Sequence, residues 1–333
     1  MKQDAAPRVQ DRPPFRVAEV ILRWEVILVL LLAAIFALNA AVSPYFLDLY
    51  NLADASYNFS EKALIALPMA FLILVRDIDL SVAATVALSA LGVGLAAAAG
   101  LGAPALIAAG IGVGLVCGMA NGALVVLTGV PAIVITIGTM SLFRGIAQVA
   151  LGDQALTQFP AGFLALGQSY AVEMPPAPLS FLLFLGFALA YGLVLHGTAA
   201  GRRLYAIGAN PVAARFSGLR VGRIRFVLFA LSGAMAGLAS VLLVARIGVV
   251  RPNIALGWEL DVITMVILGG VSIAGGLGSV PGVVLAVLVL GFTTFGLALL
   301  NVPGIVINVL IGLLLISAIA APALVRRAFG REP

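Results

Sequence analysis

The chain has 333 residues, of which 62% are apolar and only 10% are charged, and its formal net charge is +5. A soluble domain carries roughly 25% charged residues because its surface faces water, so this composition excludes a soluble globule. Runs of about 20 apolar residues recur along the chain and match the length of a membrane-crossing helix. They are continuously apolar rather than alternating, which argues against a β-barrel. We therefore expect an all-α helical bundle in a membrane.

About ten segments are predicted to cross the bilayer in chain order. They are 26–43, 60–76, 81–99, 103–127, 131–151, 179–196, 226–248, 259–274, 281–300 and 304–324. These spans form one transmembrane domain, 26–324, between terminal segments 1–25 and 325–333. The connection 152–178 contains acidic residues but no Lys or Arg, and its proline-rich stretch 175–178 is predicted to be a stiff loop rather than a span.

Most basic residues lie outside the apolar runs, in three clusters. These are Lys2, Arg8, Arg12, Arg16 and Arg23; Arg202, Arg203, Arg215, Arg220, Arg223 and Arg225; and Arg326, Arg327 and Arg331. The positive-inside rule places all three clusters in the cytoplasm. Both termini are therefore predicted to be cytoplasmic, which requires an even number of crossings. The positive charge is thus attributed to membrane topology, and no nucleic-acid partner is expected.

Two short patterns occur twice along the chain. VPAIVI at 130–135 recurs as VPGIVI at 302–307, and IDLSV at 78–82 has a counterpart in ELDVI at 259–263. The similar offsets favour a duplication, with five helices in each half. Because five is odd, the two halves would have opposite orientations, as in transporters that open alternately to either side. Chance similarity between apolar segments remains the alternative.

Nothing in the sequence predicts catalysis. A phosphate-binding loop needs Gly-Lys-Ser/Thr, whereas the only lysines are Lys2 and Lys62. The single His196 cannot build a metal cluster, and Cys117, inside an apolar run, is interpreted as a packing residue. The glycine-rich stretch 110–118 is predicted to let helices approach closely rather than to bind a nucleotide. We expect no catalytic residue, no metal site and no cofactor.

The central basic segment 197–225 contains a predicted short helix, 211–217. Asn210 is a suitable N-cap, Pro211 suits the first helical turn, and Gly218 is a natural stop. A plain basic loop would not need a capped helix with small residues, which are suited to docking into a groove of a partner protein. The residues predicted to contact this partner are Arg202, Arg203, Asn210, Pro211, Ala213, Ala214, Arg215 and Gly218.

Polar residues near or within the spans are candidates for a solute pathway, because polar groups in hydrocarbon are costly and commonly functional. The candidates are Asp79, Ser81, Asn121, Thr136, Thr139, Asp261 and Thr264. Asp79 and Asp261 each precede an apolar run, which favours capping of a helix start over contact with a solute. Asn121, beside Gly122, is interpreted as an interhelical hydrogen-bonding residue.

Four stretches in fixed order resemble permeases of ABC importers of the ribose/rhamnose/autoinducer-2 type. The segment 201–221 resembles their coupling loop, and IDLSV at 78–82 their IDLSVG signature. The stretch from NGAL at 121–124 through GVP at 129–131 to TIGT at 136–139 resembles a third block. GWELD at 257–261 with GGVS at 269–272 and GGLGS at 275–279 resembles a fourth. The sequence departs from the family pattern at three places. Arg76-Asp77 occupy positions where two glycines are common in the family, Ala83 stands in place of a glycine, and Val212 stands where the coupling helix often has an acidic residue. The Arg-Asp variant is similar to the rhamnose-type branch.

The resemblance implies a permease subunit that imports a monosaccharide, such as a pentose or a deoxyhexose like rhamnose, or a similar small polar solute, across the bacterial inner membrane. Its implied partners are cytoplasmic ABC ATPase subunits, a second permease subunit (a copy or a paralogue), an external solute-binding protein and membrane lipid. The chain itself would not be an enzyme.

Three alternatives remain open. An ion-coupled secondary transporter would need buried carboxylates or histidines in mid-helix, whereas the acids here crowd the span ends. A membrane enzyme would need a paired catalytic constellation. A branched-chain amino-acid or nucleoside ABC permease would share the same fold.

Overall fold

The computed structural model describes residues 24–328. Its helices and strands are α2 (Trp24–Val42), α3 (Leu49–Leu74), α4 (Val82–Ala98), α5 (Ala103–Thr128), α6 (Ala132–Leu151), α7 (Ala161–Gln168), β1 (Tyr170–Glu173), β2 (Pro176–Pro178), α8 (Leu179–Gly197), α9 (Ala199–Ala209), α10 (Pro211–Phe216), α11 (Val221–Ile247), α12 (Trp258–Leu268), α13 (Val280–Leu299) and α14 (Gly304–Ala328). Most of the predicted terminal segment 1–25 and the end of the predicted tail 325–333 lie outside the described residues.

Each of the ten predicted spans falls on one of these helices. Seven helices of the described chain are long and apolar enough to cross a membrane: α2, α3, α5, α6, α8, α11 and α13. The helix α4 and the part of α14 up to Ile316 are shorter apolar helices, and α12 has only 11 residues. The chain is therefore a polytopic helical membrane protein, whereas ten complete crossings remain a prediction.

Three helix boundaries differ clearly from prediction, among them the start of α11 at Val221 rather than at 226. The helix α3 begins at Leu49, well before the predicted start at 60, because the Asp48 carboxylate caps it by accepting from the N–H groups of Tyr50 and Asn51. The polar residues of its first turns interrupt the apolar run on which the prediction depended. The helix α12 ends at Leu268, before the predicted 274, because a turn through Gly269 and Gly270 follows it.

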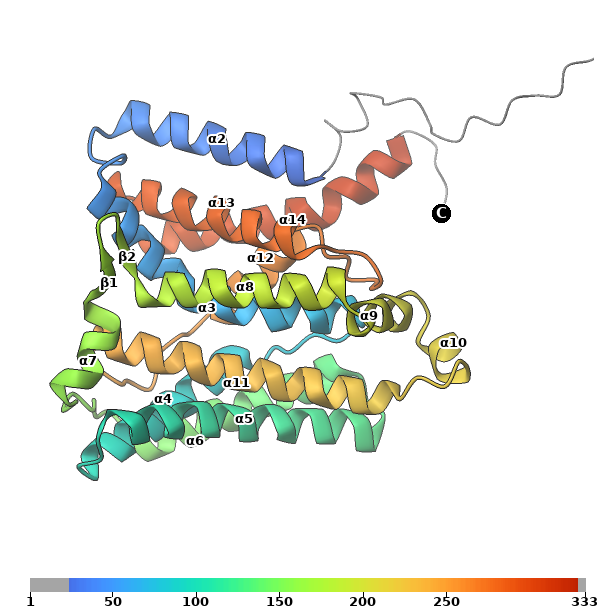
Figure 1. Ribbon diagram of the computed structural model, residues 1–333, viewed down its shortest axis with the longest axis horizontal. Coiled ribbons are helices and arrows are strands. Elements are labelled where there is room, and N and C mark those ends of the chain that lie inside the picture. The colour runs from blue at the N-terminus through green and yellow to red at the C-terminus, as the bar shows by residue number, and fades with distance from the viewer. Residues whose placement is uncertain (1–23, 329–333) are drawn as a thin grey trace, which may run out of the picture.

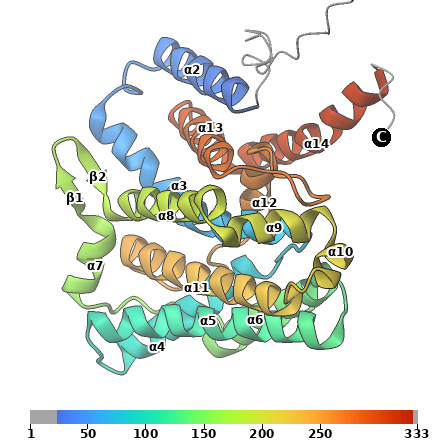
Figure 2. The same ribbon diagram turned by 45° about the vertical axis from the view of Figure 1, so that its right-hand side comes forward.

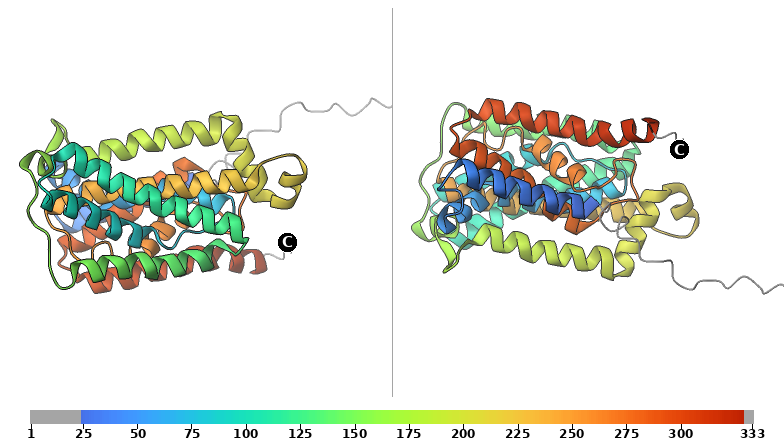
Figure 3. Two further views of the ribbon diagram at one scale, coloured as in Figure 1. Left: turned by 90° about the horizontal axis from the view of Figure 1, so that it is seen from below. Right: turned by 90° about the horizontal axis from the view of Figure 1, so that it is seen from above.

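The long helices lie side by side and run between two ends of the molecule (Figures 1 and 3). The α10 end carries α9 and α10, together with the start of α2 and the end of α14. The opposite end carries α7 and the antiparallel β1–β2 hairpin and is called the hairpin end below. The proline-rich stretch 175–178 thus supplies strand β2 rather than only a loop, and α7 and α9 were not predicted.

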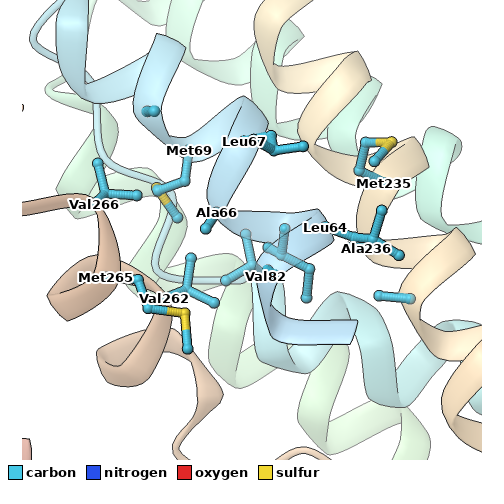
Figure 4. Packing of buried hydrophobic residues seen from close by; sticks show 14 of the residues in the cluster. Leu64, Ala66, Leu67, Met69, Val82, Met235, Ala236, Val262, Met265 and Val266 are labelled. Carbon is cyan, nitrogen blue, oxygen red and sulfur yellow. The ribbon is translucent and has the colours of Figure 1, made fainter. Parts of the chain in front are cut away.

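The centre of the bundle is α3, which packs against α8, α11, α12 and α13. Its apolar side chains are buried on several sides, as a helix in the interior of a membrane bundle requires. Leu64 and Leu67 face the side of α11 that carries Met235 and Ala236, and Met69 lies toward Val266 of α12 (Figure 4).

Glycines bring α5 and α11 into close contact. A Cβ added to Gly114 would lie 2.3 Å from Gly233 O, and one added to Gly118 would lie 2.3 Å from Phe229 O. Only glycine permits this approach, so the predicted packing role of the 110–118 stretch is confirmed. Cys117, on the same helix, is buried beside Ala84 and Phe143 in a small apolar cluster, as expected of a packing residue.

The helices of the two predicted halves exchange partners. In the first half α4 contacts α5 and α6, and in the second half α12 contacts α13 and α14. The second span of each half packs across the molecule: α3 contacts α12 and α13, while α11 contacts α4 and α5. Figure 2 shows α11 lying beside α4 and α5, with α12 and α13 on the far side of α3 and α8.

Candidate functional site: the α10 end and the buried polar cluster

The short helix α10 has the ends that its sequence predicts. The Asn210 side chain accepts hydrogen bonds at 3.0 Å from the N–H groups of Val212 and Ala213, and Pro211 occupies the first turn. Gly218, just after the helix, has a φ of +85°, which glycine adopts without steric cost. The predicted capped helix is therefore confirmed.

The outward face of the helix α10 exposes large apolar side chains. Phe216 is 90% exposed and Val212 is 62% exposed, whereas Ala214 is buried against the rest of the chain. The predicted contact residues Arg202, Arg203, Ala213 and Arg215 are also exposed. The structure thus gathers these residues on α9 and α10, at one end of the bundle of long helices (Figure 1).

The two short helices are fastened to the bundle through Arg76, which follows α3. Its guanidinium donates two hydrogen bonds of 2.7 Å, from Nε to Gly208 O and from Nη2 to Ala209 O. These are the last carbonyls of α9, which have no intrahelical partner. The Tyr205 hydroxyl donates at 2.7 Å to Gly278 O, and burial raises the pKa of this hydroxyl.

Three backbone segments meet beside this attachment. The N–H of Gly276 donates at 2.9 Å to Leu74 O at the end of α3. A Cβ on Gly208 would lie 2.0 Å from Leu74 O and 2.4 Å from Gly276 N. The end of α3, the end of α9 and the loop after α12 therefore form one tightly packed junction, which a side chain at position 208 would force apart.

The residue that follows Arg76 along the chain, Asp77, is a buried carboxylate that forms an ion pair with Arg225. Both carboxylate oxygens of Asp77 accept from the Arg225 guanidinium, from Nε and Nη2, at 2.5 Å each. Asp77 is 3% exposed, so this pairing offsets the cost of removing its charge from water. A cavity of about 280 Å³ opens next to the pair, between α10 and the start of α11, and Arg215 also lines it.

A polar cluster lies deeper in the bundle, at the break between α3 and α4. Asp79 Oδ1 accepts from the Ser81 N–H at 3.0 Å and from Ser81 Oγ at 2.6 Å, and Asp79 Oδ2 accepts from Ser232 Oγ at 3.3 Å. Asn121 Nδ2 donates to Ser81 Oγ at 2.7 Å. All four residues are buried. The predicted interhelical hydrogen bond of Asn121 is confirmed, and Asp79 binds the amide that immediately precedes α4, close to its predicted capping role.

Two further candidates adjoin this cluster. The Thr136 hydroxyl on α6 donates at 3.2 Å to Ile78 O, and Thr139 lies one turn further along the same helix with its hydroxyl directed to Thr136 O. Both threonines are buried. The structure therefore brings four predicted residues, Asp79, Ser81, Asn121 and Thr136, around the segment between α3 and α4. Thr139 contacts Thr136 within α6.

The remaining two candidates lie on α12. Asp261 lies in the first turn of α12 but does not cap it, because the N-cap position is Gly257 and no side chain caps this helix start. The Asp261 carboxylate instead pairs with Lys62 Nζ at 2.5 Å. The capping prediction for Asp261 is therefore wrong, because its carboxylate binds Lys62, a basic residue on α3 that is distant in the sequence. The Thr264 hydroxyl donates to Leu260 O within its own helix.

Two further arginines, Arg246 and Arg144, make polar contacts that no local sequence pattern predicts. The Arg246 guanidinium pairs with the buried Glu61 at 2.7 Å, which ties α11 to α3. Arg144 donates to Ile254 O at 2.7 Å and to Pro252 O at 3.3 Å. A basic residue inside an apolar run was the available signal, but the partners lie more than a hundred residues away along the chain.

At the hairpin end a larger, polar cavity of about 500 Å³ lies between the end of α6 and the 251–253 loop. Its walls are joined by the hydrogen-bonded pair Leu156 and Val250. Polar lining side chains come from Gln148, Asp153, Gln154, Arg251 and Asn253.

Comparisons with known proteins agree with this architecture. The family model for the permease component of branched-chain amino acid transport systems matches residues 51–319. The Autoinducer 2 import system permease protein LsrD of Escherichia coli K12 is 33% identical over 271 residues, which cover 80% of this chain and 81% of the relative; LsrD of Shigella flexneri and of Escherichia coli O157:H7 show the same identity and coverage. No solved structure matches the chain significantly. The chain therefore belongs to the family of branched-chain amino acid transport system permease components, and it is a multi-pass ABC permease subunit.

Proposed function

We propose that the chain imports a small sugar-like solute across the bacterial inner membrane, driven by separate ATPase subunits that dock on α10. The observation that carries this proposal is α10 itself. It is a capped helix at one end of the bundle, it exposes Val212 and Phe216, and exposed arginines surround it. An apolar helical knob within a basic rim is suited to insertion into a groove of a protein partner.

The expected topology has ten crossings with both termini in the cytoplasm. The start of α2, the end of α14 and the Arg-rich α9–α10 region lie at the same end of the molecule, which agrees with the positive-inside rule (Figure 1). The exchange of partners between α3 and α11 supports two repeats of opposite orientation. Such repeats can rock against each other and expose a central site alternately to either side.

The solute is proposed to be a monosaccharide such as rhamnose or a pentose, or a related small polar molecule, because the LsrD relatives are named for autoinducer-2 import. A separate solute-binding protein would deliver it at the hairpin end, where the polar cavity near Gln148 and Arg251 opens. A second permease subunit, a copy or a paralogue, would complete the pathway within the lipid. The buried residues around Asp79 would line it after the helices move.

The test is purification of the chain from membranes together with its associated proteins, followed by reconstitution in vesicles. We expect an ATPase to co-purify and ATP to drive uptake of at least one solute among autoinducer-2, L-rhamnose and D-ribose. Proton-driven uptake by the chain alone, without an associated ATPase, would refute the proposal.

The docking surface is tested by Phe216→Asp, which places a charge on the exposed apolar knob. We expect loss of the co-purifying ATPase with unchanged membrane insertion. Leu256→Asp is the matched control, because Leu256 is also exposed, at 70%, but lies outside α9 and α10. Equal ATPase recovery with both variants would contradict docking on α10.

A further inference from the structure

Arg76 has a backbone conformation that L-residues rarely adopt. Its φ is +70°, in the left-handed region where a Cβ atom crowds the following carbonyl. Glycine adopts this conformation at no such cost. Strain of this kind persists only where the surrounding contacts require it, so the contacts of the Arg76 side chain indicate why it stands there.

Those contacts join the end of α3 to the end of α9, next to its connection to α10. Arg76 donates to the carbonyls of Gly208 and Ala209, the two residues immediately before Asn210, and Asn210 caps α10. A cation also interacts favourably with the negative end of the helix dipole at the end of α9. A displacement of α10 that moves the end of α9 would therefore act on the Arg76 guanidinium.

The next residues along the chain carry the connection inward. Asp77 holds Arg225, in the second turn of α11, through two 2.5 Å hydrogen bonds. Asp79 and Ser81, further along the same non-helical segment, bind Ser232 of α11 and Asn121 of α5. The segment 75–81 thus has consecutive polar contacts to the end of α9, to the start of α11 and to the buried polar cluster.

We propose that Arg76 and Asp77 are positioning residues that transmit the movement of α10 to the polar cluster around Asp79. This rests on the proposed function, because the movement would come from ATPase subunits docked on α10. The segment 75–81 is suited to this role because it connects α3 to α4 without itself being helical, and because its side chains contact three separate elements, α9, α11 and α5. Neither residue contacts the solute; both act through the elements that they hold.

The test compares solute transported per ATP hydrolysed, because a purely structural role would lower the amount of folded complex without changing this ratio. Arg76→Gly removes the guanidinium and relieves the backbone strain, so the chain should still fold and assemble. In the reconstituted complex, supplied with whichever of autoinducer-2, L-rhamnose or D-ribose the unmodified complex takes up, we expect the ratio to fall at least about fivefold, the lower end of usual coupling effects.

Asp77→Asn provides a second variant of nearly the same shape, and we expect a loss of the ratio in the same direction. Arg223→Ala is the matched control: it removes an exposed arginine near the same end of α11 and should leave the ratio unchanged. If the Arg76→Gly and Asp77→Asn complexes assemble and their ratio is unchanged, Arg76 and Asp77 do not transmit the movement of α10, and the proposed function still stands. Absence of ATP-driven uptake by the unmodified complex would overturn both.

Discussion

The glycine contact between α5 and α11 allows a quantitative test of the packing. In Gly114→Ala the new Cβ would lie 2.3 Å from Gly233 O and 2.7 Å from Gly237 Cα. Both neighbours are backbone atoms, so no side-chain rotation can relieve the overlap. The helices would have to separate by about 1 Å to restore ordinary contact, which is the kind of change that overpacking imposes.

The cost follows from comparison with a second glycine on the same helix. Overpacking typically costs 1–3 kcal/mol, and the rigid neighbours place Gly114→Ala near the upper end, at about 3 kcal/mol. Gly112→Ala meets no atom within 4 Å. Both substitutions gain a similar helix-propensity contribution of about 0.5–1 kcal/mol. The difference between the two variants therefore isolates the packing term.

The measurement is the thermal unfolding midpoint of each variant in detergent, followed by size-exclusion chromatography on heated samples. We expect Gly114→Ala to unfold several degrees below the unmodified chain and Gly112→Ala to unfold at or slightly above it. Equal midpoints for the two variants would show that α5 and α11 do not approach as closely as described.

Three other changes give separate outcomes. Lys62→Met leaves the Asp261 carboxylate unpaired and should cost about 3 kcal/mol of stability; the double variant Lys62→Met/Asp261→Leu should recover part of this loss in the same thermal assay. Asn210→Ala removes the cap of α10 at a cost of about 1 kcal/mol, and ATPase recovery on co-purification should fall; unchanged recovery would contradict a requirement for the capped helix. Trp24→Phe loses the 2.7 Å hydrogen bond to Leu268 O and should lower the midpoint by an amount equivalent to about 1 kcal/mol; an unchanged midpoint would show that this bond does not anchor α2.

Several features were predicted from the sequence because their causes are local. Membrane residence follows from charge content and the length of the apolar runs. The helix α10 follows from Asn210, Pro211 and Gly218, whose effects on the backbone act within one turn. The close packing of α5 was predicted from the density of its glycines, although its partner α11 was not.

The polar candidates divide according to the range of their contacts. Asn121 was expected to bond between helices, and the structure supplies its partner, Ser81. Asp261 was expected to cap a helix start, but Lys62, 199 residues away in sequence, binds it instead. Spacing within one segment cannot reveal such a partner, because the pairing depends on which helices the bundle brings together.

The sequence by itself therefore determined that this protein is a helical membrane bundle, where most of its helices lie, and which short segment forms the capped helix at one end. Only the tertiary structure decided what joins that helix to the interior. In the sequence, Arg76 ends a predicted span and Asp77 follows it, whereas their contacts to Gly208, Ala209 and Arg225 exist only once α3, α9 and α11 meet. The physical reason is that capping and hydropathy act over a few neighbouring residues, whereas ion pairs and backbone contacts depend on the three-dimensional arrangement of distant segments.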